Sequence, residues 1–203
     1  MTKSDNSAHL DALNRVHYKA TTQILALMDG FYSNIEDGLF ELAHTTGEDE
    51  QRRRCFDLMR ELRFRKSGLL KNFSRTLDRY RVMWFSGETG NVAKVQHGLP
   101  NEMAQKSYSH FSGVLGIIAE RVSEATGNRL HASALPISPL NISRAFISSC
   151  RSLRMDTASI AIVQKLFGRF VLDSLGTVYG ETNRCLEDYG FCSLDEIEQV
   201  SGA

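Results

Sequence analysis

The stretch AHTTGEDEQRRRCFDLMREL, residues 43–62, joins two long helical patterns through a short turn. Thr46 and Gly47 interrupt the apolar periodicity, and the acidic residues 48–50 suit the positive end of a helix that starts there, with Thr46 as its predicted N-cap. Two long helices joined by so short a turn lie antiparallel. The sequence therefore predicts a helical hairpin over residues 8–84 as the basis of the fold.

Both arms of the hairpin carry one continuous apolar stripe. At 100° per residue, the apolar residues of 8–43 lie within about 60° of Ile24, and those of the second arm lie within about 80° of Leu62 as far as Trp84. Gly30 and Gly38 weaken the first helix locally without shifting its stripe. The first stripe comprises Leu10, Leu13, Ala20, Ile24, Met28, Phe31, Ile35, Leu39 and Leu42.

Further helices follow the hairpin. Residues 86–100 are rich in Gly and predict a loop, residues 101–125 a third helix, and residues 126–137 a second loop. Ser138 followed by Pro139 predicts the start of a short helix through Ser149.

Asp156 is the predicted cap of a helix over 157–189 that Gly190 ends, and Ser193 with Glu196 forms a capping box for a last helix. No segment shows sustained strand alternation. We therefore expect a single all-α domain over residues 1–203, in which a long antiparallel hairpin packs with three or four further helices, at 101–200, into a helical bundle.

The composition is that of an ordinary soluble protein, with 42% hydrophobic and 24% charged residues. The polar start has no apolar segment typical of a signal peptide, and no run is long enough to span a bilayer, so we expect a cytoplasmic protein that does not enter membranes. The four Cys include no CxxC pair and have no His at ligand spacing, which predicts neither a metal site nor a cofactor. They are expected to be small apolar core residues.

The positive charge of the chain is concentrated in one helix. Residues 51–81 carry nine Arg, two Lys and three acidic residues, whereas residues 1–50 carry three basic and nine acidic ones, and the net charge of the whole chain is zero. Most of these cations point away from the apolar stripe, and an aromatic residue lies among them. The candidate residues for binding a partner or an anion are Arg53, Arg54, Arg60, Arg63, Phe64 and Lys71.

This basic face has three interpretations. It is a solvated helix face that pairs in part with acidic Glu36, Asp37 and Glu41 of the first helix, or a surface for a protein partner, or a site for nucleic acid or a signalling nucleotide. Arg binds carboxylates and phosphates bidentately, and an exposed aromatic ring suits either docking or base stacking. The acidic neighbours weaken long-range attraction for a polyanion, which favours a protein over nucleic acid.

No motif of a known catalytic chemistry is present. GETGNVAK, residues 87–94, lacks the GxxxxGK[ST] pattern of a phosphate-binding loop, and no HExxH, Ser–His–Asp or Cys–His spacing occurs. His17 lies on the apolar face of the first helix and is predicted to be a hydrogen-bonded core residue. The sequence predicts no catalytic residues, and an enzyme with a site between helices is the weakest of the functional hypotheses.

PISPLNISRAFISSC (136–150), VQKLFGRFVLDSLGTVYGETNRCLEDYG (163–190) and DGLFELAHTTGEDEQRRRCFDLMRELRFRKSGLLKNF (37–73) resemble the N-terminal part of a proteobacterial family of unknown function. Some of its members carry an automatic thymidine phosphorylase label for which the family offers no basis, and typical members are several times longer. The resemblance implies helix-packing roles for Phe146, Leu166, Phe167, Leu175 and Tyr179. It singles out Lys165 and Asn183 as candidates for a buried polar network or a ligand site.

These observations together predict a non-enzymatic helical module of a bacterial cytoplasmic protein that binds a protein partner in regulation or signalling. Self-association is a second possibility for its long side surface. Nucleic acid or a nucleotide is the alternative ligand of the same Arg-rich face.

Overall fold

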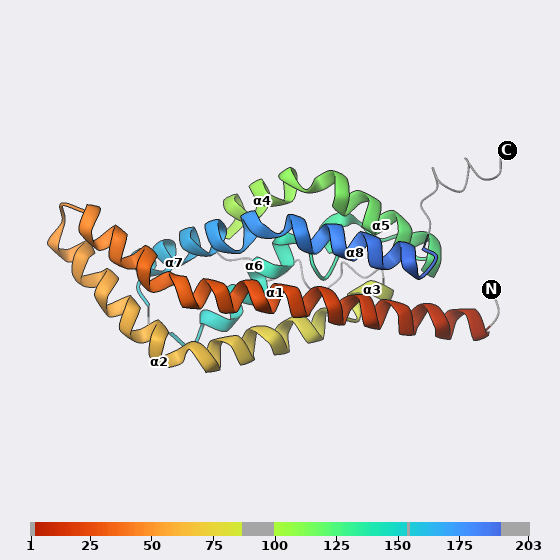
Figure 1. The fold of residues 1–203 in the computed structure, drawn as a ribbon, viewed down its shortest axis with the longest axis horizontal. Coiled ribbons are helices and arrows are strands. Elements are labelled where there is room, and N and C mark those ends of the chain that lie inside the picture. The colour runs from red at the N-terminus through yellow and green to blue at the C-terminus, as the bar shows by residue number, and fades with distance from the viewer. Residues whose placement is uncertain (1–2, 87–99, 154, 192–203) are drawn as a thin grey trace.

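Helix α1 (Lys3–Thr45) runs along the length of the protein and returns through a short turn into α2 (Asp49–Tyr80), which lies antiparallel beside it (Figure 1). The computed structural model describes residues 3–86, 100–153 and 155–191, and within these ranges the chain forms helices and no strand. The predicted hairpin and the all-α fold class are therefore confirmed.

The remaining helices cover the other sides of α1. Helices α7 and α8 run along α1 on the side away from α2, α5 packs against α8, and α6 lies between α2 and α4 (Figure 1). The long α1 thereby packs against helices on more than one side, while another face of it stays exposed. These elements are α3 (Met83–Ser86), α4 (Pro100–His110), α5 (Ser112–Thr126), α6 (Pro139–Cys150), α7 (Thr157–Phe170) and α8 (Gly176–Asp188), with short 3₁₀ turns η1 (Ala132–Ala134) and η2 (Leu172–Ser174).

The core follows the predicted stripes. Phe31 of α1 makes edge-to-face contacts with Phe146 of α6 and Phe167 of α7, at ring-centroid distances of 5.8 and 6.0 Å, while Phe146 and Phe167 stack at 3.9 Å. Such aromatic pairs stabilise by about 1 kcal/mol beyond their buried area. Leu10 departs from the expectation, because 45% of it is exposed. The family-motif residues predicted to pack helices are all buried: Phe146, Leu166, Phe167, Leu175 and Tyr179.

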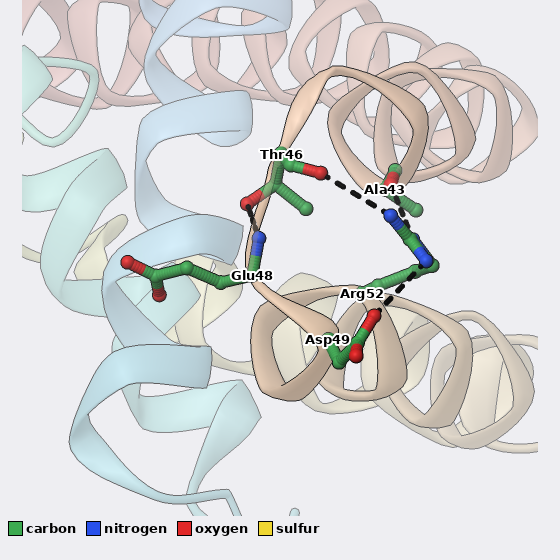
Figure 2. Close-up of polar contacts among 5 residues, drawn as sticks. All are labelled: Ala43, Thr46, Glu48, Asp49 and Arg52. Atoms are coloured by element: carbon green, nitrogen blue, oxygen red, sulfur yellow. Dashed lines mark hydrogen bonds and ion pairs between the residues drawn. The ribbon is translucent and has the colours of Figure 1, made fainter.

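The hairpin turn is held by Arg52 rather than by a Thr46 cap (Figure 2). The Nε of Arg52 donates to the carbonyl of Ala43 at 3.3 Å, and its Nη1 pairs with Asp49 at 3.1 Å. Thr46 Oγ1 accepts from the backbone N–H of Glu48 at 3.3 Å, and Glu48 occupies the N-cap position of α2 without a side-chain cap. The prediction that Thr46 is the N-cap of α2 is wrong. Glu48 holds the N-cap position, and the Thr46 hydroxyl stabilises the turn before it.

Two predicted long helices are each interrupted once. Helix α2 stops at Tyr80, and Trp84 belongs to the separate α3. The third helix is divided at Phe111 into α4 and α5, where the Ser112 hydroxyl donates to the Ser109 carbonyl at 2.9 Å. A hydroxyl that bonds back to the preceding turn competes with the backbone ladder and bends helices.

The predicted helix over 157–189 consists of α7, η2 and α8, so its continuity was wrong while both of its ends were right. Asp156 caps α7 by accepting from Ser159 N–H at 2.8 Å. Gly190 ends α8 in the left-handed conformation, with φ of 77°. Ser138 caps α6 as predicted, accepting from Asn141 N–H at 3.3 Å. The predicted capping box at 193–196 and most of the predicted loop 86–100 lie outside the described residues.

Candidate functional site

The outward face of α2 carries a line of exposed cations with an aromatic ring among them. At 100° per residue, Arg53, Arg60, Phe64 and Lys71 lie within about 20° of one line, and the line is about 27 Å long at 1.5 Å per residue. All four side chains are exposed, and 86% of Phe64 is accessible to solvent. Arg53, Arg60 and Lys71 form no ion pair with any residue in the described ranges. We call these four residues the α2 ridge.

The flanking arginines have partners within the protein. Arg63 makes a bidentate ion pair with Glu36 of α1, in which Nε donates to Oε1 at 2.8 Å and Nη2 donates to Oε2. These hydrogen bonds hold the pKa of Glu36 below its usual value. Arg54 pairs with Glu50 at 3.1 Å and with Asp156, the cap of α7, at 3.2 Å. These two members of the predicted set therefore tie α2 to α1 and to α7.

The seam between α1 and α2 carries one more ion pair of this kind. Lys66 Nζ lies 2.8 Å from Asp29 on α1, and Arg65 pairs with Glu61 within α2 at 2.6 Å, as the i,i+4 spacing predicts. Part of the basic segment is thus neutralised where it faces the acidic first helix, whereas the cations of the ridge, Arg53, Arg60 and Lys71, take no part in these pairs.

A groove of about 800 Å³ lies beside the ridge, between α2 and the start of α7. Its wall includes the apolar side chains of Leu58 and Met155. Opposite charges in equal number leave the groove with little net field for a polyanion. The charged residues that line it are Arg53, Arg54, Arg60, Arg65, Glu50, Asp57, Glu61 and Asp156.

The two polar residues of the family motif lie apart from each other. Lys165 is exposed on α7, so the expectation that it is buried is wrong. Asn183 of α8 is half-buried, and its Nδ2 donates to Glu187 Oε1 at 3.0 Å. Asn183 thus belongs to a polar network at the end of α8, whereas Lys165 borders a hollow beside α4.

The centre of that network is Arg121, which the sequence analysis did not single out. Arg121 of α5 is 3% exposed; its Nη1 donates to the Phe191 carbonyl at 2.6 Å, and its Nη2 pairs with Glu187 at 2.8 Å. A buried Arg with these partners fastens the end of α8 to α5. Its position three residues after buried Ile118 places it on the apolar face, and that phase is the signal that would have revealed it.

His17 is confirmed as a hydrogen-bonded core residue. It is 3% exposed, its Nδ1 accepts from the Trp84 indole N–H at 3.0 Å, and burial lowers its pKa to about 4. Cys55 and Cys185 are buried and free, as expected of apolar core residues. Among the described residues, no cluster of three or more His, Cys, Asp or Glu side chains is placed to hold a metal ion.

A sequence model of the family described as Protein of unknown function (DUF1631) N-terminal domain matches residues 8–84 and 99–190. The match covers the hairpin and the helices that follow it, which confirms the resemblance to the N-terminal part of an unknown-function family. No curated protein and no solved structure matches the chain. In the parts of the chain that the structure describes, no helix combines the length and the apolar character needed to cross a bilayer.

Proposed function

The chain belongs to this family of unknown function, and we propose that it is a non-enzymatic protein-binding module whose α2 ridge docks on a protein partner in cytoplasmic regulation or signalling. The observation that carries the proposal is the exposure of Phe64, 86% accessible within a line of cations that have no ion-pair partner in the described chain. Guanidinium, ammonium and phenyl groups are suited to binding a partner molecule. Near neutral pH they are poor bases and poor nucleophiles, which favours binding over catalysis.

The composition of the ridge matches the anatomy of interfaces. Binding energy concentrates in a few aromatic and Arg residues, which dock into pockets of the partner inside a polar rim. Phe64 would supply the apolar anchor, and Arg53, Arg60 and Lys71 would pair with carboxylates of the partner. The neighbouring groove is lined by equal numbers of positive and negative side chains. A partner surface that carries both signs of charge and an apolar pocket therefore suits the site.

Nucleic acid is the second candidate for the same ridge. Its support is the cation–aromatic combination, since phosphates pair with Arg and bases stack on phenyl rings. The acidic residues of the groove argue against it, because they reduce the phosphate attraction that dominates such binding.

The test is an affinity capture from lysate of the source organism, read by mass spectrometry and by nucleic-acid quantification. Wild type is compared with an Arg53→Glu, Arg60→Glu, Lys71→Glu variant. The control has the same change in charge at exposed cations elsewhere, namely Lys106→Glu, Arg129→Glu and Arg169→Glu. Circular dichroism verifies that both variants keep the wild-type helical content.

We expect one protein to be captured by wild type and by the control and to be lost from the ridge variant. With that protein purified, Phe64→Ala is expected to weaken binding by at least about thirtyfold, which corresponds to the loss of about 2 kcal/mol that defines a hot spot. Loss of nucleic acid from the ridge variant, together with a steep salt dependence, would favour the second candidate. Identical captures from all three proteins would mean that the ridge is a solvated helix face.

A further inference from the structure

A cavity of about 230 Å³ lies between α4, α6 and α7, on residues that the α2 ridge does not use. Its apolar wall consists of Met103, Phe146, Ile147, Ala161, Phe167 and Leu172. Met103 closes one side by close packing, because a Cβ added at Gly168 would lie 1.7 Å from its Cε. Helix α4 therefore sits directly on α7, and the cavity is the space left beside that contact.

One side chain in this wall is a buried polar group without a partner. Ser143 of α6 is 3% exposed, and its hydroxyl makes no hydrogen bond to any residue that the structure describes. A buried hydroxyl in that state is unfavourable, so native proteins satisfy such groups with a ligand or an ordered water. The other polar side chains that line the cavity are Gln164, Glu102 and Lys165.

The mouth of the cavity carries one charge of each sign. Glu102 and Lys165 line it, and both side chains are exposed. Their opposite charges select for neither an anion nor a cation, and an ion moved into the apolar interior would lose its hydration. The charges at the mouth and the single interior hydroxyl therefore both favour a neutral ligand.

The cavity has a neighbour between α6 and α7. A second hollow of about 220 Å³ shares Phe146, Ile147 and Gln164 with the first and extends to Cys150 and Ile160. At about 30 Å³ for each water-sized group, the first cavity alone holds about eight such groups. An unbranched ligand of about eight carbons would fill it.

We infer that this cavity is a binding site for a small, neutral and mostly apolar molecule with one hydrogen-bonding oxygen, such as an alkyl ketone or alcohol, and that Ser143 is the group that binds the oxygen. The apolar walls hold the carbon chain against Phe146 and Phe167, and the hydroxyl donates to the ligand oxygen. The site stands independently of the proposal for the α2 ridge, because the two share no residue.

The test titrates the intact protein with 2-octanone and with octanoate while the ¹³C-methyl signals of Met103 and Ile147 are recorded by NMR. Ser143→Ala removes the hydroxyl and leaves the walls in place. Ser148→Ala, on an exposed position of the same helix, is the matched control. Urea unfolding of all three proteins reports whether any of them is destabilised.

We expect 2-octanone to shift both methyl signals of the wild type with a Kd of about 1 mM or tighter. Ser143→Ala should weaken its binding by about threefold to tenfold without loss of stability, and Ser148→Ala should bind as wild type does. Octanoate should bind more weakly than 2-octanone. Equal affinity of wild type and Ser143→Ala, tighter binding of octanoate, or unmoved methyl signals at 5 mM ketone would each overturn the inference.

Discussion

Acidification from pH 7 to pH 5 should destabilise the protein by about 2 kcal/mol through His17 alone. The imidazole is buried in the α1–α3 contact, where its Nδ1 accepts the indole N–H of Trp84, and burial lowers its pKa from 6.5 to about 4. In the unfolded chain the same group titrates near its ordinary value. Folding therefore excludes a proton that the unfolded chain binds in this range of pH.

The magnitude follows from the two pKa values. A folded pKa below the unfolded one gives stability that is present above pH 6.5 and is lost as the pH falls towards 4. At about 1.4 kcal/mol per pKa unit, the whole loss is about 3 kcal/mol, of which about 2 kcal/mol has occurred at pH 5. The lowered pKa values of Glu36 and Asp156 act below this window, because their ordinary values are 4.5 and 3.8.

Urea unfolding at pH 7 and pH 5, followed by circular dichroism, measures the loss. The fluorescence of Trp84, which is the only Trp and is 1% exposed, reports the same transition from inside the contact. His17→Gln keeps an acceptor for the indole and removes the titration, so its stability should change little between the two pH values. The control His131→Gln, at an exposed position, should keep the wild-type dependence. Parallel pH profiles for wild type and His17→Gln would refute the reasoning.

Four further substitutions test other parts of the structure by urea unfolding. Ser138→Ala removes the cap of α6 and should destabilise by about 1 kcal/mol. Arg121→Met leaves the Phe191 carbonyl without its donor and should destabilise by about 1–3 kcal/mol. Gly190→Ala places a side chain at φ of 77° and should destabilise by about 1–2 kcal/mol. Phe64→Ser should change stability by less than about 0.5 kcal/mol, since the ring is 86% exposed; a larger loss would mean that the ridge is structural.

The helices were predictable where local signals agreed with packing. The break between α7 and α8 was missed because the apolar stripe was followed across it as one helix. At 100° per residue, the buried residues of α8, such as Thr182 and Leu186, lie about 100° around the helix from those of α7, such as Val163 and Phe167. One straight helix cannot bury both sets against the same neighbours, so the chain breaks at η2.

The candidate sites also differ in how far the sequence could predict them. The outward direction of Arg53, Arg60 and Lys71 followed from the phase of one helix, and the structure places them as that phase predicts. The cavity at Ser143 depends on how α4, α6 and α7 meet, and no spacing within a single helix encodes that meeting. The exposure of Lys165 was missed for a different reason. At 100° per residue it lies about 160° from buried Phe167, so the helix phase indicates exposure, whereas a family motif does not say which of its polar members face the core.

The acidic residues of α1 neutralise only part of the basic residues of α2. Acidic α1 and basic α2 pair across their seam through Glu36 with Arg63 and Asp29 with Lys66, and such pairs favour this antiparallel arrangement while adding little stability at a surface. The ridge faces the other way and takes no part in that pairing. If the face only had to be solvated, charged side chains would suffice, whereas the exposed ring of Phe64 lowers solubility. Under the proposed function a partner would bury this ring, and for this reason Phe64, rather than any arginine, is the residue on which that proposal rests.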